Sequence, residues 1–300
     1  MTHYQEIALT WLDLPNPDGV SNREVLKPYV NGNDITQTPS RRWIVDFGQM
    51  SLEQARKYRR PIQYVENEVK PTRDTNNRAA YRERWWWFSE PRPGMRRALN
   101  GLERFIVTSS VSKHRFFLWF TPPNLPSSTL VVFADSSDFM YGVLNSSIHI
   151  CWADGKGSTL EDRSRYGPTT CFETFPFPKP SSEQEEAIAR AARFLEQMRQ
   201  FLKRPEGAKL TLTGMYNELE AWRSKGGGSE KYAGLEQLSE AHRTLDAAVT
   251  AAYGWTWPLE KEEVLSRLLA LNLERATLES GGVPVTSVGV EDVLEEGETL

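Results

Sequence analysis

The stretch from residue 161 to residue 178 contains the side chains best suited to reading nucleic acid. A carboxylate and two guanidiniums occupy alternate positions there, at Glu161, Arg163 and Arg165. Arginine pairs with guanine and glutamate with cytosine in the major groove of DNA, so these three residues could contact base edges. Threonine and phenylalanine then alternate between residues 170 and 175, which predicts a half-buried, rigid strand that ends at the following prolines. The alternative is a ladder of surface ion pairs, which would contribute little to stability.

Basic residues are concentrated in one part of the chain. The net charge is −4, yet residues 51–115 hold 15 Lys and Arg against 7 Asp and Glu. Residues 181–300 hold 13 Lys and Arg against 21 Asp and Glu. A surface that faces phosphates requires such a concentration, although a solvated helix face would have the same composition. We predict that the arginines between residues 59 and 97 position a DNA backbone, and we assign this role to Arg92, Arg96 and Arg97.

A run of four aromatic residues, from Trp85 to Phe88, lies among these arginines. Aromatic and basic residues together suit nucleic-acid backbones and exposed bases. The simpler interpretation is that the tryptophans form a core and the arginines stack on their outer edges. We expect the tryptophans to be mostly core and the arginines to be partly phosphate contacts.

Hydrophobic periodicity predicts the elements that position these residues. Asn31-Gly32 predicts a tight turn, and strands are expected at residues 8–14, 42–47, 104–108, 114–120 and 130–134. Helices are expected at residues 51–58 and 138–152. After the prolines at 176–180 the apolar spacing becomes wholly helical. Ser182 and Glu185 there have the spacing of a capping box. Four amphipathic helices are predicted, at about residues 182–202, 213–223, 235–252 and 264–278.

These elements predict an α+β fold, in which a twisted mixed β-sheet with flanking helices is followed by an all-α helical bundle. A chain of 300 residues suffices for two domains. We divide it into an N-terminal remnant or linker (1–20), the α+β domain (21–180), the bundle (181–279) and an acidic disordered tail (280–300). The two cysteines, Cys151 and Cys171, indicate a reducing compartment. Since no apolar run approaches the ~20 residues of a membrane span and no signal peptide is evident, we expect a cytoplasmic protein without membrane contacts.

The sequence contains no motif that indicates catalysis. It has no glycine-rich loop for S-adenosylmethionine and no Asn/Asp-Pro-Pro-aromatic motif for a flipped adenine, and its histidines and cysteines lack metal-ligand spacing. We therefore predict no catalytic residue, metal site or cofactor site in this chain. One alternative is a magnesium-dependent nuclease built on Asp46, Glu68 and Lys70. Another is a protein-interaction module that uses the tryptophans and the acidic bundle.

Six stretches resemble one protein family in their order and spacing. They are KPYVNGNDI (27–35), RWIVDF (42–47), YVENEVKPTRD (64–74), WWWFSEPRPGM (85–95), SKHR (112–115) and TTCFETFPFP (169–178). The chain resembles, from about residue 20 to residue 278, the C-terminal part of MmeI-like type II restriction–modification enzymes. That part comprises the DNA target-recognition domain and the helical region after it.

The resemblance implies that the chain is a fragment or a stand-alone specificity module for double-stranded DNA. In that family an adenine-N6 methyltransferase and a nuclease domain accompany the module, so they are expected here in the same or a separate chain. S-adenosylmethionine and magnesium are then expected for the parent enzyme rather than for this chain. The family's base-reading positions match Glu161, Arg163 and Arg165. Lys113, His114 and Arg115 are further candidates for DNA contacts.

Overall fold

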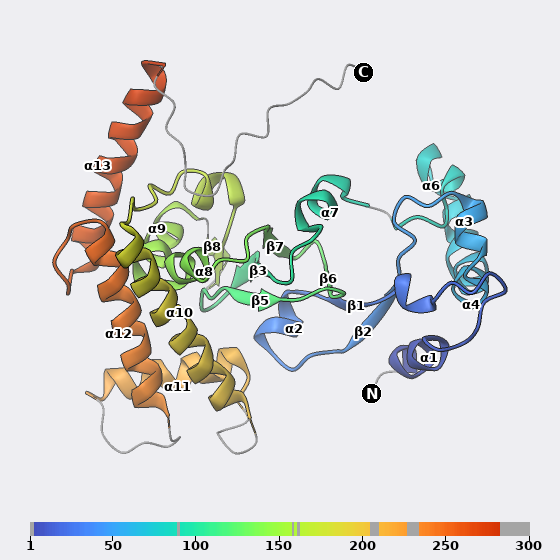
Figure 1. The fold of residues 1–300 in the computed structure, drawn as a ribbon, viewed down its shortest axis with the longest axis horizontal. Coiled ribbons are helices and arrows are strands. Elements are labelled where there is room, and N and C mark those ends of the chain that lie inside the picture. The colour runs from blue at the N-terminus through green and yellow to red at the C-terminus, as the bar shows by residue number, and fades with distance from the viewer. Residues whose placement is uncertain are drawn as a thin grey trace.

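The computed structural model describes residues 3–88, 91–157, 159–160, 163–204, 210–226 and 234–282. Figure 1 shows a lobe of short N-terminal helices at one end, three small sheets near the middle, and long C-terminal helices at the other end. The predicted α+β class is confirmed, because mixed sheets with flanking helices precede a helical region. None of the helices in the described ranges is long and apolar enough to cross a membrane.

The sheet beside the N-terminal lobe has three strands in the order β2-β1-β6. The strands are β1 (Leu26–Val30), β2 (Arg42–Val45) and β6 (Leu125–Pro126). A small core includes Val25, Phe47 and Trp85. The helical segments are α1 (His3–Trp11), η1 (Asn22–Glu24), α2 (Gly32–Thr36), α3 (Leu52–Arg56), α4 (Arg59–Tyr64), η2 (Val65–Val69), α5 (Lys70–Asp74) and α6 (Ala79–Glu83).

The middle of the molecule holds two further sheets. The first has the order β5-β3-β7 and contains β3 (Phe105–Ser109), β5 (Leu118–Phe120) and β7 (Leu130–Phe133). Every residue of β3 is buried. The second has the order β4-β9-β8 and contains β4 (Val111–Ser112), β8 (Thr159–Leu160) and β9 (Arg163–Arg165). The helical segments around them are α7 (Pro93–Leu99), α8 (Asp138–Asn145), α9 (Ser147–Lys156) and η3 (Pro168–Phe172).

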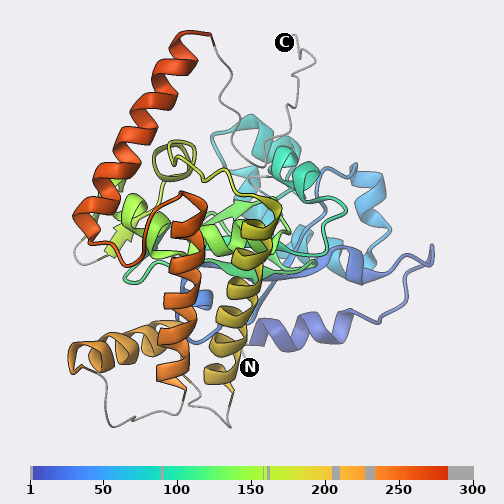
Figure 2. The same cartoon turned by 60° about the vertical axis from the view of Figure 1, so that its left-hand side comes forward.

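The four predicted C-terminal helices are confirmed as α10 (Ser182–Lys203), α11 (Leu212–Ser224), α12 (Leu235–Ala252) and α13 (Lys261–Ser280). Helices α10 and α12 run side by side (Figures 1 and 2). The capping box of α10 is formed by Ser181 and Gln184, one residue earlier than predicted. Leu195 and Leu245 of these helices share one core with Phe117 of the central sheet region. The bundle therefore has no core of its own among the described residues, although the sequence predicted a separate domain from residue 181.

Four local predictions were wrong for identifiable reasons. Residues 8–14 lie partly in α1 instead of a strand, and Asn31 caps α2 instead of forming a tight turn. The helix predicted at 138–152 is two helices, because Ser146 adopts an extended conformation and caps α9 through the His149 amide. The strand predicted at 170–175 is a helical turn that begins at Pro168. The predicted tail begins at the end of α13, and residues 283–300 lie outside the described residues.

Candidate nucleic-acid interface

The two predicted base-reading arginines that the structure describes lie on strand β9. Ser164 of this strand pairs with Ser112 of β4 on one side and with Thr159 of β8 on the other. Arg163 and Arg165 are exposed and Ser164 is half-buried, as the alternation of side chains along a strand requires. The sequence predicted that these charged residues precede a strand, whereas Arg163 and Arg165 lie within strand β9. Glu161 lies outside the described residues.

The buried guanidinium of Arg115 is hydrogen-bonded to strand β9. Its Nη2 atom donates to the carbonyl oxygen of Ser164 at 2.8 Å and lies 3.2 Å from the Ser164 hydroxyl. Its Nη1 atom donates to the Thr108 hydroxyl at 3.1 Å and to the Ser109 carbonyl. Arg115 is only 5% exposed, so the prediction that it contacts the DNA backbone is wrong. Burial lowers the pKa of Arg115 to about 10, which leaves it charged at neutral pH.

Tyr166 and His149 complete the support of β9. The Tyr166 amide donates to the Ser110 carbonyl at 2.8 Å, and its buried hydroxyl lies 3.0 Å from His149 Nε2. The guanidinium of Arg115 lies 5.2 Å from the centre of the Tyr166 ring. Burial, together with the charge of Arg115, lowers the pKa of His149 to about 3. His149 is therefore neutral at physiological pH and acts in packing.

Gly157 fixes how closely α9 approaches β9. A Cβ atom at this position would lie 2.5 Å from the Arg165 carbonyl oxygen and 2.8 Å from the Ala153 carbonyl oxygen. Only glycine permits this contact between the end of the helix and the strand. The sequence analysis missed this role of Gly157 as a spacer.

Lys113 and His114 join this region to helix α11. Lys113 Nζ donates to Asn217 Oδ1 at 2.9 Å, and His114 Nε2 lies 2.8 Å from the same oxygen. His114 Nδ1 lies 3.3 Å from Glu220 Oε1, and the histidine side chain is only 8% exposed. The prediction that His114 contacts DNA is therefore wrong, because both ring nitrogens face α11. Lys113 is exposed.

Arg96, predicted to contact phosphate, binds the carboxylate of Asp46. Its Nη1 and Nη2 atoms bind the two carboxylate oxygens of Asp46 at 2.8 and 2.9 Å, and its Nε atom donates to the Pro91 carbonyl. The Asp46 carboxylate is buried and also lies 3.7 Å from Lys27 Nζ. These acceptors give Arg96 a structural role, and its contact with phosphate stays a prediction. Arg97, on the same helix, is exposed, and Arg92 is half-buried.

The pairing of Asp46 also contradicts the arrangement that a nuclease would need. Glu68 is exposed on η2, and Lys70 pairs with Asp74 at 2.9 Å. In the described part of the chain, no three His, Cys, Asp or Glu side chains are grouped so that they could hold a metal ion. Asp46 is therefore assigned to the packing of α7 against the N-terminal lobe.

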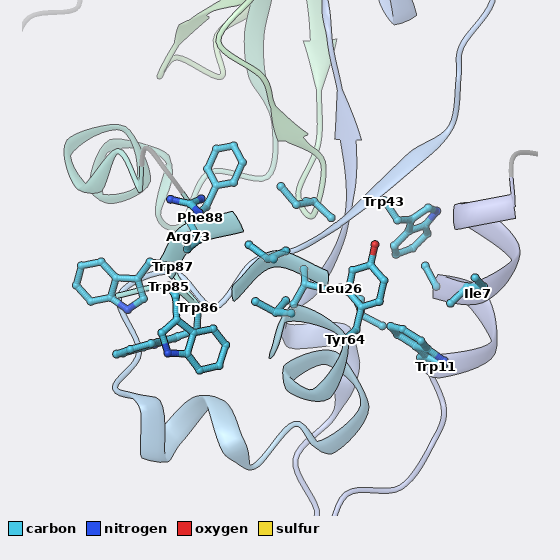
Figure 3. A pocket seen from close by; sticks show the side chains of 15 residues that line it. Ile7, Trp11, Leu26, Trp43, Tyr64, Arg73, Trp85, Trp86, Trp87 and Phe88 are labelled. Carbon is cyan, nitrogen blue, oxygen red and sulfur yellow. The ribbon is translucent and has the colours of Figure 1, made fainter. Parts of the chain in front are cut away.

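The tryptophan run lines an apolar cavity of about 310 Å³ in the N-terminal lobe (Figure 3). Trp85 is buried, and the indole nitrogens of Trp86 and Trp87 donate to the Met50 carbonyl at 2.9 and 2.8 Å. Arg84 stacks 4.7 Å from the centre of the Trp87 ring. The expectation that the tryptophans belong mostly to a core agrees with these contacts.

Comparison with known proteins places this site in a family. The family described as "MmeI, target recognition domain" matches residues 16–179. DNA methyltransferase A of Bacillus subtilis (strain 168) is 27% identical over 175 residues, which are 56% of this chain and 17% of that protein. A solved structure of the type IIL restriction-modification enzyme MmeI in complex with DNA matches with a TM-score of 0.65 and 19% identity.

The structural match covers 86% of this chain and 32% of the MmeI chain, so this chain spans less than one third of the length of either relative. At this identity the match establishes the fold. The family match covers more than half of the chain and confirms the resemblance inferred from the six stretches. The chain belongs to the family of MmeI target recognition domains.

Proposed function

We propose that this chain recognises a specific sequence in double-stranded DNA for a restriction–modification adenine-N6 methyltransferase and endonuclease. The main support for the proposal is that two arginines on β9 are exposed. The backbone of this strand is hydrogen-bonded to buried Arg115. Base recognition needs donors held in fixed positions, since a mobile arginine loses conformational entropy when it binds.

Arg163 and Arg165 are proposed to contact base edges in the major groove. Each bidentate contact to guanine contributes ~1–3 kcal/mol of discrimination against another base. Glu161, in the connection between β8 and β9, retains its proposed role as an acceptor for the cytosine amino group. The direct base readout of the module is therefore assigned to one short hairpin.

Phosphate contacts are proposed for the predicted cations that remain on the surface. Arg97 and Lys113 are exposed, and Arg92 is kept as a third candidate. Contacts of this kind fix the register of a protein on the duplex without reading its sequence. They also make the affinity fall steeply as salt rises.

The chemical steps are assigned to other domains of the complete enzyme, in this chain or in a separate one. A methyltransferase domain flips the target adenine and uses S-adenosylmethionine, and a nuclease domain uses magnesium. The residues on the surface of the present module contribute binding and orientation only.

Selection from a labelled duplex pool tests the proposal. Wild type should retain a defined sequence, and Arg163→Ala should retain a different or degenerate set because one base contact is lost. Arg243→Ala is the matched control, since Arg243 is exposed on α12, outside the proposed surface. Identical retained sequences for wild type and Arg163→Ala would remove the base-reading claim.

A further inference from the structure

A groove of about 850 Å³ separates the turn after α2 from the C-terminal half of α10. Strand β5 contributes Trp119 and Phe120 to its wall, and α10 contributes Glu196 and Lys203. The turn contributes Arg41 and Arg42. Its described lining contains no residue of the β8–β9 hairpin.

Lys203 places an ammonium group in the wall of the groove. It is half-buried, and no hydrogen bond or ion pair of its side chain is formed with the described residues. The nearby Glu196 carboxylate accepts from the Tyr141 hydroxyl and the Gln200 amide, each at 2.5 Å, and it also attracts the Lys203 charge. Burial lowers the pKa of Lys203. An anion in the groove would compensate the cost of burying this charge.

Arg41 is held in a strained backbone conformation on the opposite rim. Its φ is 53°, in the left-handed region that disfavours residues with a side chain. The turn is locked by buried Asp34, which accepts from the Ser40 amide at 2.7 Å and the Ser40 hydroxyl at 2.5 Å. Arg42 lies 3.5 Å from the same carboxylate. The guanidinium of Arg41 is exposed and has no partner in the part of the chain that the structure describes. A left-handed backbone at an exposed arginine is unfavourable, and such conformations are retained mostly at functional sites. The conformation of Arg41 is therefore consistent with a role in binding a ligand.

Basic residues outnumber acids in the described lining of the groove, with Arg41, Arg42 and Lys203 against Asp34 and Glu196. The Asp34 carboxylate is occupied by Ser40 and Arg42, and the Glu196 carboxylate by Tyr141 and Gln200. Since Arg42 pairs with Asp34 and a single further acid, Glu196, lies in the described lining, the excess positive charge lies with Arg41 and Lys203. Both carry the sign that attracts phosphate.

We propose that this groove binds the sugar–phosphate backbone of one DNA strand beside the recognised sequence, with Arg41 and Lys203 as its phosphate ligands. The inference rests on the proposed function and extends it by a second contact area. The groove contributes affinity and register, while the β8–β9 hairpin contributes sequence preference. DNA bound in both places would contact the turn after α2 and helix α10 as well as β9.

The test compares the full chain with Arg41→Gly, Lys203→Gln and the double variant. Arg41→Gly relieves the left-handed strain, so its urea midpoint should equal or exceed that of wild type. Loss of DNA affinity in this variant cannot then be attributed to unfolding. Arg190→Gln combined with Arg243→Gln is the matched control, since both arginines are exposed on α10 and α12 outside the groove.

The affinity for the selected duplex should fall about threefold to tenfold for each groove variant, equally for all sequences, because a counterion-releasing contact is lost. The slope of log affinity against log salt should decrease by about one for each cation removed. Unchanged affinity and slope in the double variant, with selective binding intact in wild type, would overturn the groove proposal alone. Absence of sequence preference in wild type would instead contradict the proposed function.

Discussion

Arg115 Nη2 lies 2.8 Å from the carbonyl oxygen of Ser164, the residue between the two exposed arginines of β9. A buried cation thus fixes the backbone of the strand whose side chains face solvent. The same guanidinium reaches Thr108 and Ser109 at the end of β3. Arg115 therefore links the position of Arg163 and Arg165 to the central sheet.

Arg115→Gln should lower the free energy of unfolding by roughly 2–4 kcal/mol, since charge-assisted bonds are lost and buried carbonyl groups are left unpaired. Arg115→Lys should be more stable than Arg115→Gln because it keeps the charge. It should still be less stable than wild type, because an ammonium group lacks the planar fork of N–H groups of a guanidinium. Urea unfolding gives the stability, and selection from a duplex pool gives the sequence preference. If the Arg115→Lys protein retained the same DNA sequences as wild type from the pool, the guanidinium of Arg115 would not be needed to position β9.

Gly157→Ala should destabilise the fold by about 1–3 kcal/mol, because the added methyl group would lie 2.5 Å from the Arg165 carbonyl oxygen. It should also weaken sequence selection, since β9 must move. Gly94→Ala is the control: nothing lies within 4 Å of a Cβ atom there. That substitution in α7 should be neutral or slightly stabilising. Equal thermal midpoints for the two variants would contradict the spacer role of Gly157.

His149 should make the fold sensitive to acid. Its pKa is lowered to about 3 in the folded state by burial, whereas an unfolded histidine has a pKa of about 6.5. The unfolded chain therefore binds the extra proton, and stability is lost as pH falls below about 6.5. At pH 5 this one group would contribute a loss of roughly 2 kcal/mol relative to pH 7.5.

Urea unfolding of wild type and His149→Gln at pH 7.5 and pH 5 measures this effect. The variant should be less stable than wild type at pH 7.5, because the contact with Tyr166 is altered, and should lose less stability on acidification. Other titrating groups are common to both proteins and cancel in the comparison. An equal loss of stability in the two proteins would show that His149 is not the responsible group.

Arg96→Ala should lower the free energy of unfolding by roughly 2–4 kcal/mol, because it leaves the buried Asp46 carboxylate without its bidentate partner. Arg97→Ala, one residue further along α7, should change the unfolding free energy by less than about 0.5 kcal/mol. It should weaken the binding of all duplexes and reduce the salt dependence. Denaturant titration and DNA binding at two salt concentrations separate these roles. A stable Arg96→Ala protein with weakened DNA binding would reverse the assignment.

The sequence predicted the elements whose signal is local. Helices α10 to α13 were found because apolar residues recur at helical spacing over 13 to 22 residues. Strand β3 was found because its residues from Phe105 to Thr108 are apolar or β-branched. The alternation of residues 170–175 misled, since Phe172 ends a helical turn and its ring and that of Phe175 both pack against Phe177.

The site was only partly predictable, because its supports join residues that are distant in sequence. Arg115 and Ser164 are 49 residues apart, and Arg96 and Asp46 are 50 apart. Arginine is usually exposed, so its type alone favoured phosphate contacts for Arg96 and Arg115. The arginines of β9 were predicted from their chemistry, and the structure shows that both are exposed.

The central claim is that a side chain on β9 reads a base, and Arg163→Glu tests it most directly. Glutamate accepts a hydrogen bond from cytosine where arginine donates to guanine. Selection from a duplex pool should therefore change guanine to cytosine at one position and leave the other positions unchanged. A retained sequence identical to that of wild type, or a uniform loss of binding to every sequence, would contradict the account.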